Sequence, residues 1–363
     1  MDFVHLHNHS YYSLLQSPAK PSDIIKKAKS QGCPAVALTD NGVMYGGIEF
    51  YKYCKKEDIK AIIGMEVFLT RRSMEQKEGR MDMPFASLVL LAENQDGYEN
   101  LLNIASISNL YGNYYKPRID WETLSQYKFG LIALSSGLSG EIAQAILNRV
   151  PTHEIEKIIL RYHELFGENN FFLEIAHHPN LPHQNELNDQ LIEWGEKLKI
   201  PVVLAQDAYY VNSEDREAQD VIANIGSNIG IGDFLKQSII DDDYSIPDPS
   251  EIIESFSHCP EAIANTLKIA DRCNVTFELG KYRIPAFNPP PGNSAKTPLE
   301  YLRSECVQGL KKRYPQFAEH LRLIKWQGIN TDTRIPTAEV NTSPEEFSGE
   351  MIAERFEHEI SVI

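Results

Sequence analysis

Short apolar runs alternate with amphipathic stretches along most of the sequence, and this pattern constrains the fold more than any other feature. Apolar runs are typical of buried strands, and apolar residues three or four apart are typical of helices that cover a sheet. Such alternation predicts an α/β protein with a parallel sheet covered by helices, either closed as a barrel or open and doubly wound. The pattern predicts strands over residues 3–7, 35–39, 61–70, 87–91, 130–134, 171–175 and 201–206, and helices over residues 22–30, 98–108, 152–166 and 184–198.

Polar side chains with metal-binding chemistry lie within or just after these strands, where α/β proteins collect their chemistry. His5 and His7 are two residues apart on the first predicted strand, so both are expected on one face. Histidine nitrogens with carboxylate oxygens suit zinc, manganese or iron, and two or three such ions activate water against a phosphoester. An isolated pair of histidines is more often a packed or surface pair. The candidates on later strands are Asp40, Glu66, Glu174, His178 and Asp207.

The charge balance limits the kinds of partner. The formal net charge of −16 argues against this segment being the main DNA-gripping surface, because affinity for nucleic acid comes largely from Lys and Arg. No run approaches the roughly 18–20 apolar residues of a membrane span, and the first residues do not read as a signal peptide. These features predict a cytoplasmic protein with no membrane contact and only indirect contact with DNA. The five cysteines never form a Cys-x-x-Cys pair, so no disulfide framework or thiolate zinc site is expected.

Other polar features leave alternatives open. The run of three aspartates, Asp241 to Asp243, could hold magnesium, but adjacent side chains cannot all face one ion, and a polar turn is the preferred interpretation. Residues 226–233 contain several glycines but lack the order of a phosphate-binding loop. His9 is ambiguous because the first strand could end before it, and His177 is an undecided neighbour of His178.

Seven stretches, in order along the chain, carry a resemblance that no single one would: FVHLHNHSYYSLL, PAVALTDNGVMYGGIEFYKYCKK, IIGMEVFLT, LVLLAENQDGYENLLNIAS, LIALSSGLSGEIA, FFLEIAHHPNLPHQNELNDQL and PVVLAQDAYYVNSEDREAQDVI. Together they resemble the PHP domain of the bacterial polymerase III alpha family, the C-family replicative polymerases. The resemblance covers residues 1 to about 285. It implies a distorted seven-stranded barrel related to the TIM type, with a metal cluster at its mouth in members that retain the ligands.

The ligand set that the resemblance implies is incomplete in this chain. Each replacement removes a nitrogen or charged oxygen donor, which argues against a complete cluster of three ions. One Zn, Mn or Mg ion held by His5, His7, Glu66 and Asp207 is one possibility, and a hydrogen-bonded network in the barrel mouth is the other. The positions that match the family pattern are His5, His7, Glu66, His178 and Asp207, with His9, Asp40 and Glu174 as weaker neighbours; the replaced positions are Gln16, Asn41, Ser87 and Tyr209.

Residues 286–363 differ from the rest of the chain. A proline-rich connector is followed by a predicted helix over residues 298–314 and by a polar stretch, residues 328–343. The preceding GKYRIPAFNPPPG resembles the junction to the polymerase palm in the family, which predicts a barrel domain over residues 1–285 and a linker with the start of a palm region over residues 286–363. The paired carboxylates that hold two magnesium ions for polymerisation are not found in the sequence.

Three functional interpretations follow. In the first, the chain is the N-terminal domain of a replicative polymerase, whose barrel supports the rest of the alpha subunit and docks a proofreading exonuclease. In the second, it is a metal-dependent phosphoesterase, a 3′–5′ exonuclease or pyrophosphatase, acting through the remaining ligands. In the third, it is a free-standing phosphatase. The junction counts against the third and the missing ligands count against the second, so the first is preferred.

Overall fold

The computed structural model describes residues 2–81, 85–227, 242–281, 285–295, 297–317 and 348–362. Contacts divide the chain into two units, Met1–Glu278 and Leu279–Ile363, and each is described here by itself. The polar stretch 328–343, Asp241 and residues 228–233 of the glycine-containing run lie outside the described residues. No helix in the described part of the chain is long and apolar enough to cross a membrane.

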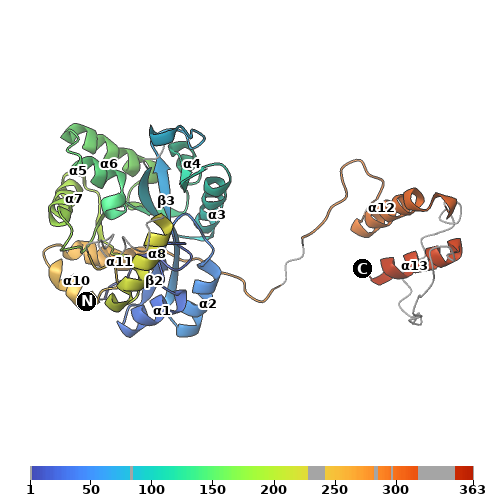
Figure 1. The fold of residues 1–363 in the computed structure, drawn as a ribbon, viewed down its shortest axis with the longest axis horizontal. Helices are drawn as coiled ribbons and strands as arrows, with labels where there is room; N and C mark the ends of the chain where they lie inside the picture. The colour runs from blue at the N-terminus through green and yellow to red at the C-terminus, as the bar shows by residue number, and fades with distance from the viewer. Residues whose placement is uncertain are drawn as a thin grey trace. The chain divides into compact units, whose positions relative to one another are not determined.

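The first unit is a sheet that curls into a barrel-like ring (Figure 1). Every predicted strand region contains a strand. The first segment is paired on both sides: β1 pairs with β10, and an isolated bridge joins His5 to Val36 of β2. A short hairpin, β5 with β6, extends from β3. The strands are β1 (His7–Asn8), β2 (Ala35–Leu38), β3 (Lys60–Thr70), β4 (Phe85–Ala92), β5 (Asn113–Tyr114), β6 (Lys116–Ile119), β7 (Leu131–Leu134), β8 (Phe171–Ile175), β9 (Val202–Leu204) and β10 (Asp207–Ala208).

The sheet is mixed, so the expectation of a parallel sheet is wrong at β4, and also at the short hairpin strand β5, which runs antiparallel to β6. β4 runs antiparallel to both of its neighbours, β3 and β7, whereas β2 with β3, β7 with β8 and β8 with β9 are parallel. The physical reason is the connection: no α-helix lies between β3 and β4 among the described residues, and a strand that returns without a helical crossover pairs antiparallel. The beginning of β4, rather than its end, therefore lies at the mouth with the carboxyl ends of the parallel strands.

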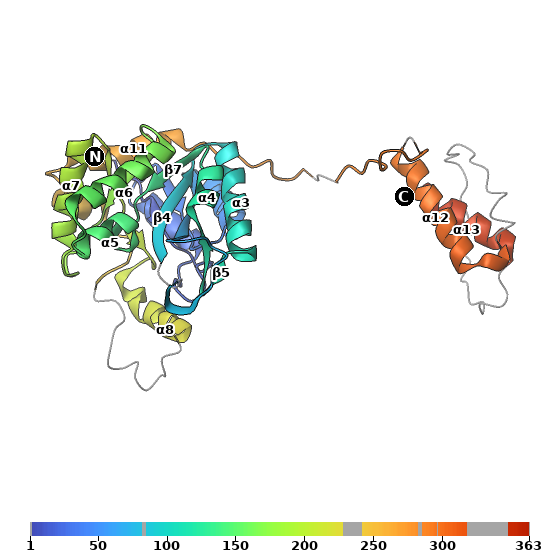
Figure 2. The same cartoon turned by 90° about the horizontal axis from the view of Figure 1, so that it is seen from above.

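Helices cover the outside of the ring, as Figure 2 shows from a second direction. The alternation of side chains separates two cores: one inside the barrel, including Leu6, Ala37 and Val89, and a larger one between strands and helices, including Ile24, Met65 and Leu101. The helices of this unit are α1 (Pro21–Ser30), α2 (Gly47–Glu57), α3 (Gln95–Leu110), α4 (Trp121–Gln126), α5 (Glu141–Leu147), α6 (Thr152–Phe166), α7 (Gln184–Leu198), α8 (Arg216–Ser227), α10 (Pro249–Ser255) and α11 (Pro260–Arg272), with 3₁₀ turns η1 (Gly79–Met81), η2 (Gly137–Ser139) and η3 (Ser213–Asp215).

Helix α11 packs at the end of the barrel opposite the mouth. Its Ile269 and Ala270 belong to the core inside the barrel. Thr266 Oγ1 accepts a hydrogen bond from Val4 N at 3.3 Å, and Asn265 Nδ2 donates to Val202 O at 2.7 Å. Since these partners lie at the beginnings of the first and last strand regions, α11 closes the amino-terminal end of the ring and leaves the carboxyl end open.

The second unit contains α12 (Pro298–Arg313), η4 (Pro315–Phe317) and α13 (Gly349–Val362). Thr297 begins α12 with a capping box that includes Glu300, the pattern that the sequence predicts for a helix start. Arg303 of α12 donates to Glu357 of α13 at 2.8 Å and lies over the ring of Phe356. The palm identity of this unit and the boundary at residue 285 stay predictions.

The close approach of α3 to the turn before β7 depends on a glycine. A methyl group added to Gly97 would lie 1.9 Å from Gly130 O. Alanine normally stabilises a helix relative to glycine by about 1 kcal/mol, but overpacking costs about 1–3 kcal/mol. We therefore expect Gly97→Ala to lower the free energy of unfolding, measured by urea denaturation. Gly309→Ala in α12, where nothing lies within 4 Å of the added carbon, is the control and should not lower it. Equal stability of Gly97→Ala and the unchanged chain would contradict the packing described.

Candidate metal centre at the barrel mouth

His7 stands at the centre of the mouth. Its Nδ1 donates to Glu174 Oε1 at 2.8 Å, and its Nε2 lies 3.7 Å from Glu66 Oε2. Burial alone would lower the pKa of His7, but the charge of Glu174 and the hydrogen bond to it raise that pKa well above its ordinary value. The two carboxylates beside the buried His7, one from β3 and one from β8, thus favour the protonated form of its ring.

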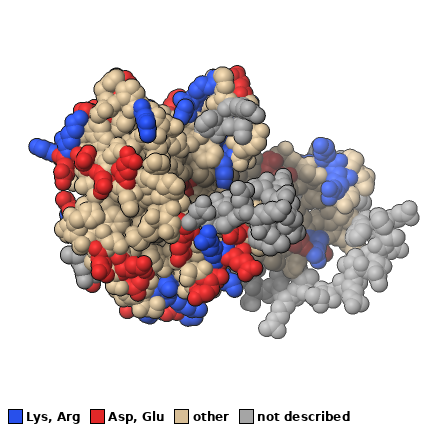
Figure 3. Space-filling model, turned by 60° about the vertical axis from the view of Figure 1, so that its left-hand side comes forward, with Lys and Arg blue, Asp and Glu red and all other residues tan. Residues whose placement is uncertain are grey.

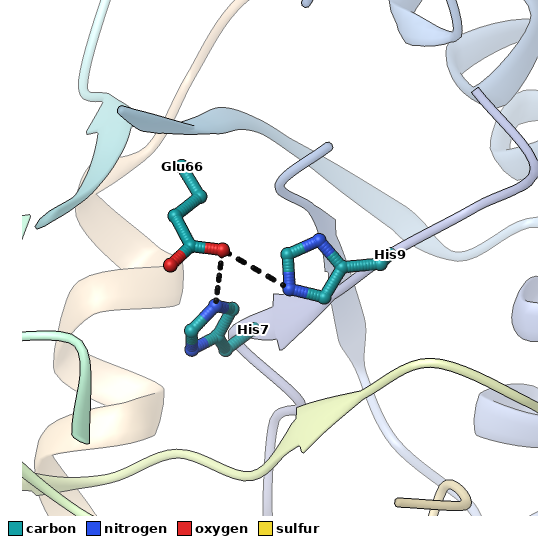
Figure 4. Close-up of side chains that lie close together, drawn as sticks. All are labelled: His7, His9 and Glu66. Atoms are coloured by element: carbon teal, nitrogen blue, oxygen red, sulfur yellow. Dashed lines mark ion pairs between the residues drawn. The ribbon is translucent and has the colours of Figure 1, made fainter. Parts of the chain in front are cut away.

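His9 approaches the same carboxylate from the other side. Figure 4 shows the imidazoles of His7 and His9 directed at Glu66, with His9 Nε2 3.5 Å from Glu66 Oε2. Burial lowers the pKa of His9 to about 4, so its ring is neutral. Burial would raise the pKa of Glu66, but the contact with His7 and its charge lower it to about 2. These three residues offer ligand atoms within 4.8 Å of one another, the one such group found among the described residues.

The expectation that His5 and His7 share a face is wrong. His5 Nε2 donates to Gln31 Oε1 at 3.0 Å, and its ring lies edge-on to Phe3, on the helix side of the sheet. The two-residue period holds only in a continuous strand, whereas here a single bridge at His5 precedes a two-residue strand at His7. The pair that faces Glu66 is His7 with His9, which the sequence alone left ambiguous.

His178 and Asp207 form a second ion pair in the mouth. His178 Nε2 donates to Asp207 Oδ1 at 2.6 Å, and its Nδ1 lies 3.5 Å from Asp242 Oδ2. Burial opposes the charge, but these carboxylates raise the pKa of His178, and the charge of His178 lowers the pKa of Asp207 despite burial. Asp242 is itself buried and accepts a hydrogen bond from Asn180 Nδ2 at 3.1 Å.

Two residues of the mouth were missed by the sequence interpretation. Asp242 was assigned to a polar turn because its partners, His178 and Asn180, are remote in sequence. Ser136 donates through its hydroxyl to Glu66 Oε1 at 3.0 Å and through its backbone N–H to Glu174 Oε2 at 3.1 Å. Its place directly after the apolar run that forms β7 is the signal that could have identified it.

The replaced positions are bonded to the residues that remain. Asn41 Nδ2 donates to Gln16 Oε1, so two replaced positions satisfy each other. The Tyr209 ring stacks on His9 with ring centroids 4.3 Å apart. Ser87, at the start of β4, is near enough to Glu66 to contribute to the lowered pKa of that carboxylate. The four positions thus contact one another or the histidine and glutamate of the mouth.

Asp40 is buried and accepts several hydrogen bonds from neighbouring residues. Its carboxylate accepts hydrogen bonds from Ser10 N at 2.7 Å, from Ser10 Oγ at 2.8 Å and from Ser13 Oγ at 2.8 Å. Burial raises its pKa, and these hydrogen bonds oppose the shift. Asp40 therefore orients the segment that follows β1.

The donor set fits one ion better than a cluster. His7 Nε2 and His9 Nε2 are buried and have no hydrogen-bond partner among the described residues, and both face Glu66. Two nitrogens and a carboxylate suit zinc or manganese. The replaced positions place an amide, a hydroxyl and a phenol where further donors would be needed, so a complete cluster does not fit.

Comparison with known proteins places the fold and the mouth in a family. Residues 5–178 match the family model described as "PHP domain". The chain is 40% identical over 329 residues to the DNA polymerase III subunit alpha of Borreliella burgdorferi, covering 88% of this chain and 28% of that protein. The chain is therefore similar, over most of its own length, to the N-terminal region of DNA polymerase III alpha subunits. The match of residues 5–178 to the PHP domain agrees with the resemblance.

Other alpha subunits give the same result. The chain is 36% identical over 323 residues to that of Treponema pallidum, covering 89% of this chain and 27% of the relative, and 35% identical over 374 residues to that of Thermus aquaticus, covering 98% and 30%. The chain therefore spans less than a third of the length of these relatives. A solved structure titled a putative metal-dependent phosphoesterase from Bifidobacterium adolescentis is 11% identical, with a TM-score of 0.37 over 57% of this chain and 87% of that one.

We expect Asp40→Ala to destabilise the PHP domain by roughly 2–4 kcal/mol, because buried donors from Ser10 and Ser13 would lose their acceptor. Urea denaturation measures the change. The matched control is Asp189→Ala, on an exposed position of α7, which should shift stability by less than about 0.5 kcal/mol. A loss of stability no larger than that of the control would show that the Asp40 network does not hold the segment after β1.

Proposed function

We propose that this chain is the N-terminal module of a replicative DNA polymerase, in which the PHP barrel is a structural domain. It would support the remainder of the alpha subunit and dock a separate proofreading exonuclease. The observation that carries this proposal is the bonding of the replaced positions: Gln16 with Asn41, and Tyr209 stacked on His9. A mouth whose substitutions satisfy one another is arranged for stability. A cytoplasmic location stays a prediction that accompanies this role.

The surface supports an indirect relation to DNA. On the face drawn in Figure 3, acidic and basic side chains are intermixed, and no continuous band of Lys and Arg crosses the described part of that face. The net charge of −16 points the same way, because phosphate contacts need clustered cations. DNA binding and polymerisation are therefore assigned to the remainder of the polymerase.

A second function is favoured by one specific observation. The unpartnered nitrogens of His7 and His9 face Glu66, which is the arrangement of a single metal site. A zinc or manganese ion bound there would supply an activated water for attack on a phosphoester. The second candidate is accordingly a metal-dependent phosphoesterase acting on DNA ends or pyrophosphate.

Metal content distinguishes the two functions when measured by mass spectrometry on protein loaded with manganese or zinc. We expect at most one ion per chain, no hydrolysis of single-stranded DNA or pyrophosphate, and loss of any bound ion in His9→Ala. His153→Ala is the control, because that side chain is 70% exposed on α6 and should leave metal content unchanged.

Metal-dependent hydrolysis that is lost in His9→Ala and retained in His153→Ala would overturn the structural role and support the phosphoesterase. Two or more ions per chain would do the same, since the replaced positions would then be binding metal in spite of their chemistry.

Docking of the exonuclease is tested by co-purification. The immobilised chain should retain the proofreading exonuclease of the same cell in a one-to-one complex, measured by size-exclusion chromatography with light scattering. Retention should be insensitive to EDTA, because the proposed docking role requires no ion. Failure of the folded chain to retain the exonuclease at micromolar concentration would rule out the docking role while leaving the support of the polymerase to be tested in the full subunit.

A further inference from the structure

A cavity of about 300 Å³ opens at the mouth beside the His7 cluster. It lies where the ends of β8 and β10 meet the start of α7 and the side of α8. No Lys or Arg is among the described residues that line it. The lining residues that matter to the chemistry are Gln16, Gln184, Gln219, Asp207, Tyr209 and Tyr244.

The side-chain oxygen of Gln184, Oε1, is a hydrogen-bond acceptor without a donor among the described residues. Its side chain is buried, with the residue 1% exposed, and Nε2 donates to Asn188 Oδ1 at 2.9 Å. Asn188 is itself oriented, because its Nδ2 donates to Ala176 O at 2.8 Å. These bonds fix which end of the Gln184 amide is oxygen. Its Oε1 has no hydrogen-bond partner among the described residues.

Gln184 lines the cavity, and a buried acceptor without a donor is unfavourable, so an occupant that reaches this oxygen should bring an N–H group. The same cavity holds the Asp207 carboxylate, whose side chain is 30% exposed. His178 does not reverse the local charge, because its two ring nitrogens face Asp207 and Asp242. The hydrogen-bond acceptors and the negative charge together favour an occupant of the cavity that donates hydrogen bonds and carries a positive charge.

Two aromatic rings in the cavity indicate which kind of cation fits there. Tyr209 and Tyr244 both line the cavity, with ring centroids 5.9 Å apart and the planes inclined at 67°. A flat cation stacks on such rings, and a guanidinium group can also donate two parallel hydrogen bonds to a carboxylate. An ammonium group has the positive charge, but it is not flat and cannot donate two parallel hydrogen bonds to one carboxylate.

The residues beside the cavity favour a protein side chain over a nucleotide as its occupant. Leu14 and Leu15, which directly precede Gln16, are 69% and 51% exposed. Exposed apolar side chains next to a polar socket are typical of protein contacts, in which arginine and tyrosine contribute most of the binding energy. A nucleotide would bring phosphate to a cavity without a Lys or Arg to receive it.

We propose that the cavity at the barrel mouth is a socket for an arginine side chain of a partner protein, with Gln184 and Asp207 as acceptors and apolar neighbours of that arginine covering Leu14 and Leu15. This goes beyond the structural role, because it assigns a ligand class to the mouth itself and holds whichever protein docks there.

Binding of small probes to the full chain tests the socket. N-acetyl-arginine amide is titrated by ligand-observed NMR against its neutral analogue N-acetyl-citrulline amide and against cytidine. Saturable binding of the arginine probe, at least about tenfold tighter than that of the citrulline probe, is expected, because only the guanidinium carries charge. Tighter binding of cytidine than of the arginine probe would overturn the proposal, as would no saturable binding of the arginine probe.

Variants locate the binding. Gln184→Met keeps the length of the side chain, removes the acceptor and should weaken the arginine probe about tenfold. Gln308→Met, on an exposed position of α12, is the matched control and should leave affinity unchanged. If Gln184→Met does not fold, Tyr244→Leu, which removes one aromatic face, should weaken the arginine probe instead. Unchanged affinity in whichever of these two variants folds would place the arginine elsewhere and overturn the socket.

Discussion

The imidazolium of His7 is the interaction on which the barrel mouth depends. Glu66 and Glu174 are buried beside the partly exposed Asp207, and buried carboxylates are tolerated only where a cation and hydrogen bonds compensate them. His7 supplies the charge to Glu66 and Glu174, while His178 supplies it to Asp207. His7 also pairs with Asp207 in the ladder of β1 with β10, where the ring of strands closes. One residue thus both closes the sheet and neutralises its open end.

The same charge explains how the mouth can hold its carboxylates when Gln16, Asn41, Ser87 and Tyr209 stand at the positions where the resemblance implies metal ligands. Metal ligands bind in their deprotonated form, so an ion at His7 would have to displace the proton that now pairs with Glu174 and Glu66. Without further donors at Asn41, Ser87 and Tyr209, an ion would gain few bonds in exchange. The protonated histidine and the surrounding hydrogen bonds provide the compensation that a metal cluster would otherwise provide, which is why the replaced residues are bonded and not merely tolerated.

The sequence predicted the strands well because buried strands leave a continuous apolar record, as in IIGMEVFLT of β3 and FFLEI of β8. It could not predict the direction of β4, which depends on the connection from β3 and not on composition. It also could not decide between His5 and His9, because the first segment is too short for its period to be regular. Asp242 was invisible for another reason: its partner His178 is 64 residues away, and an acidic run carries no mark of burial.

The chemistry of the mouth therefore separates into two halves with different requirements. Around His7 the carboxylates of Glu66 and Glu174 have a histidine beside them, although His7 Nε2 and His9 Nε2 have no hydrogen-bond partner among the described residues. Around Gln184 a hydrogen bond is also missing, because Asn188 fixes the amide and its buried oxygen has no donor among the described residues. A site for phosphoesters would need cations at that place, whereas this one offers an amide oxygen, a carboxylate and two phenol rings. Loss of metal ligands on one side and retention of acceptors on the other are what a barrel would show if its mouth had changed from holding ions to holding a basic side chain.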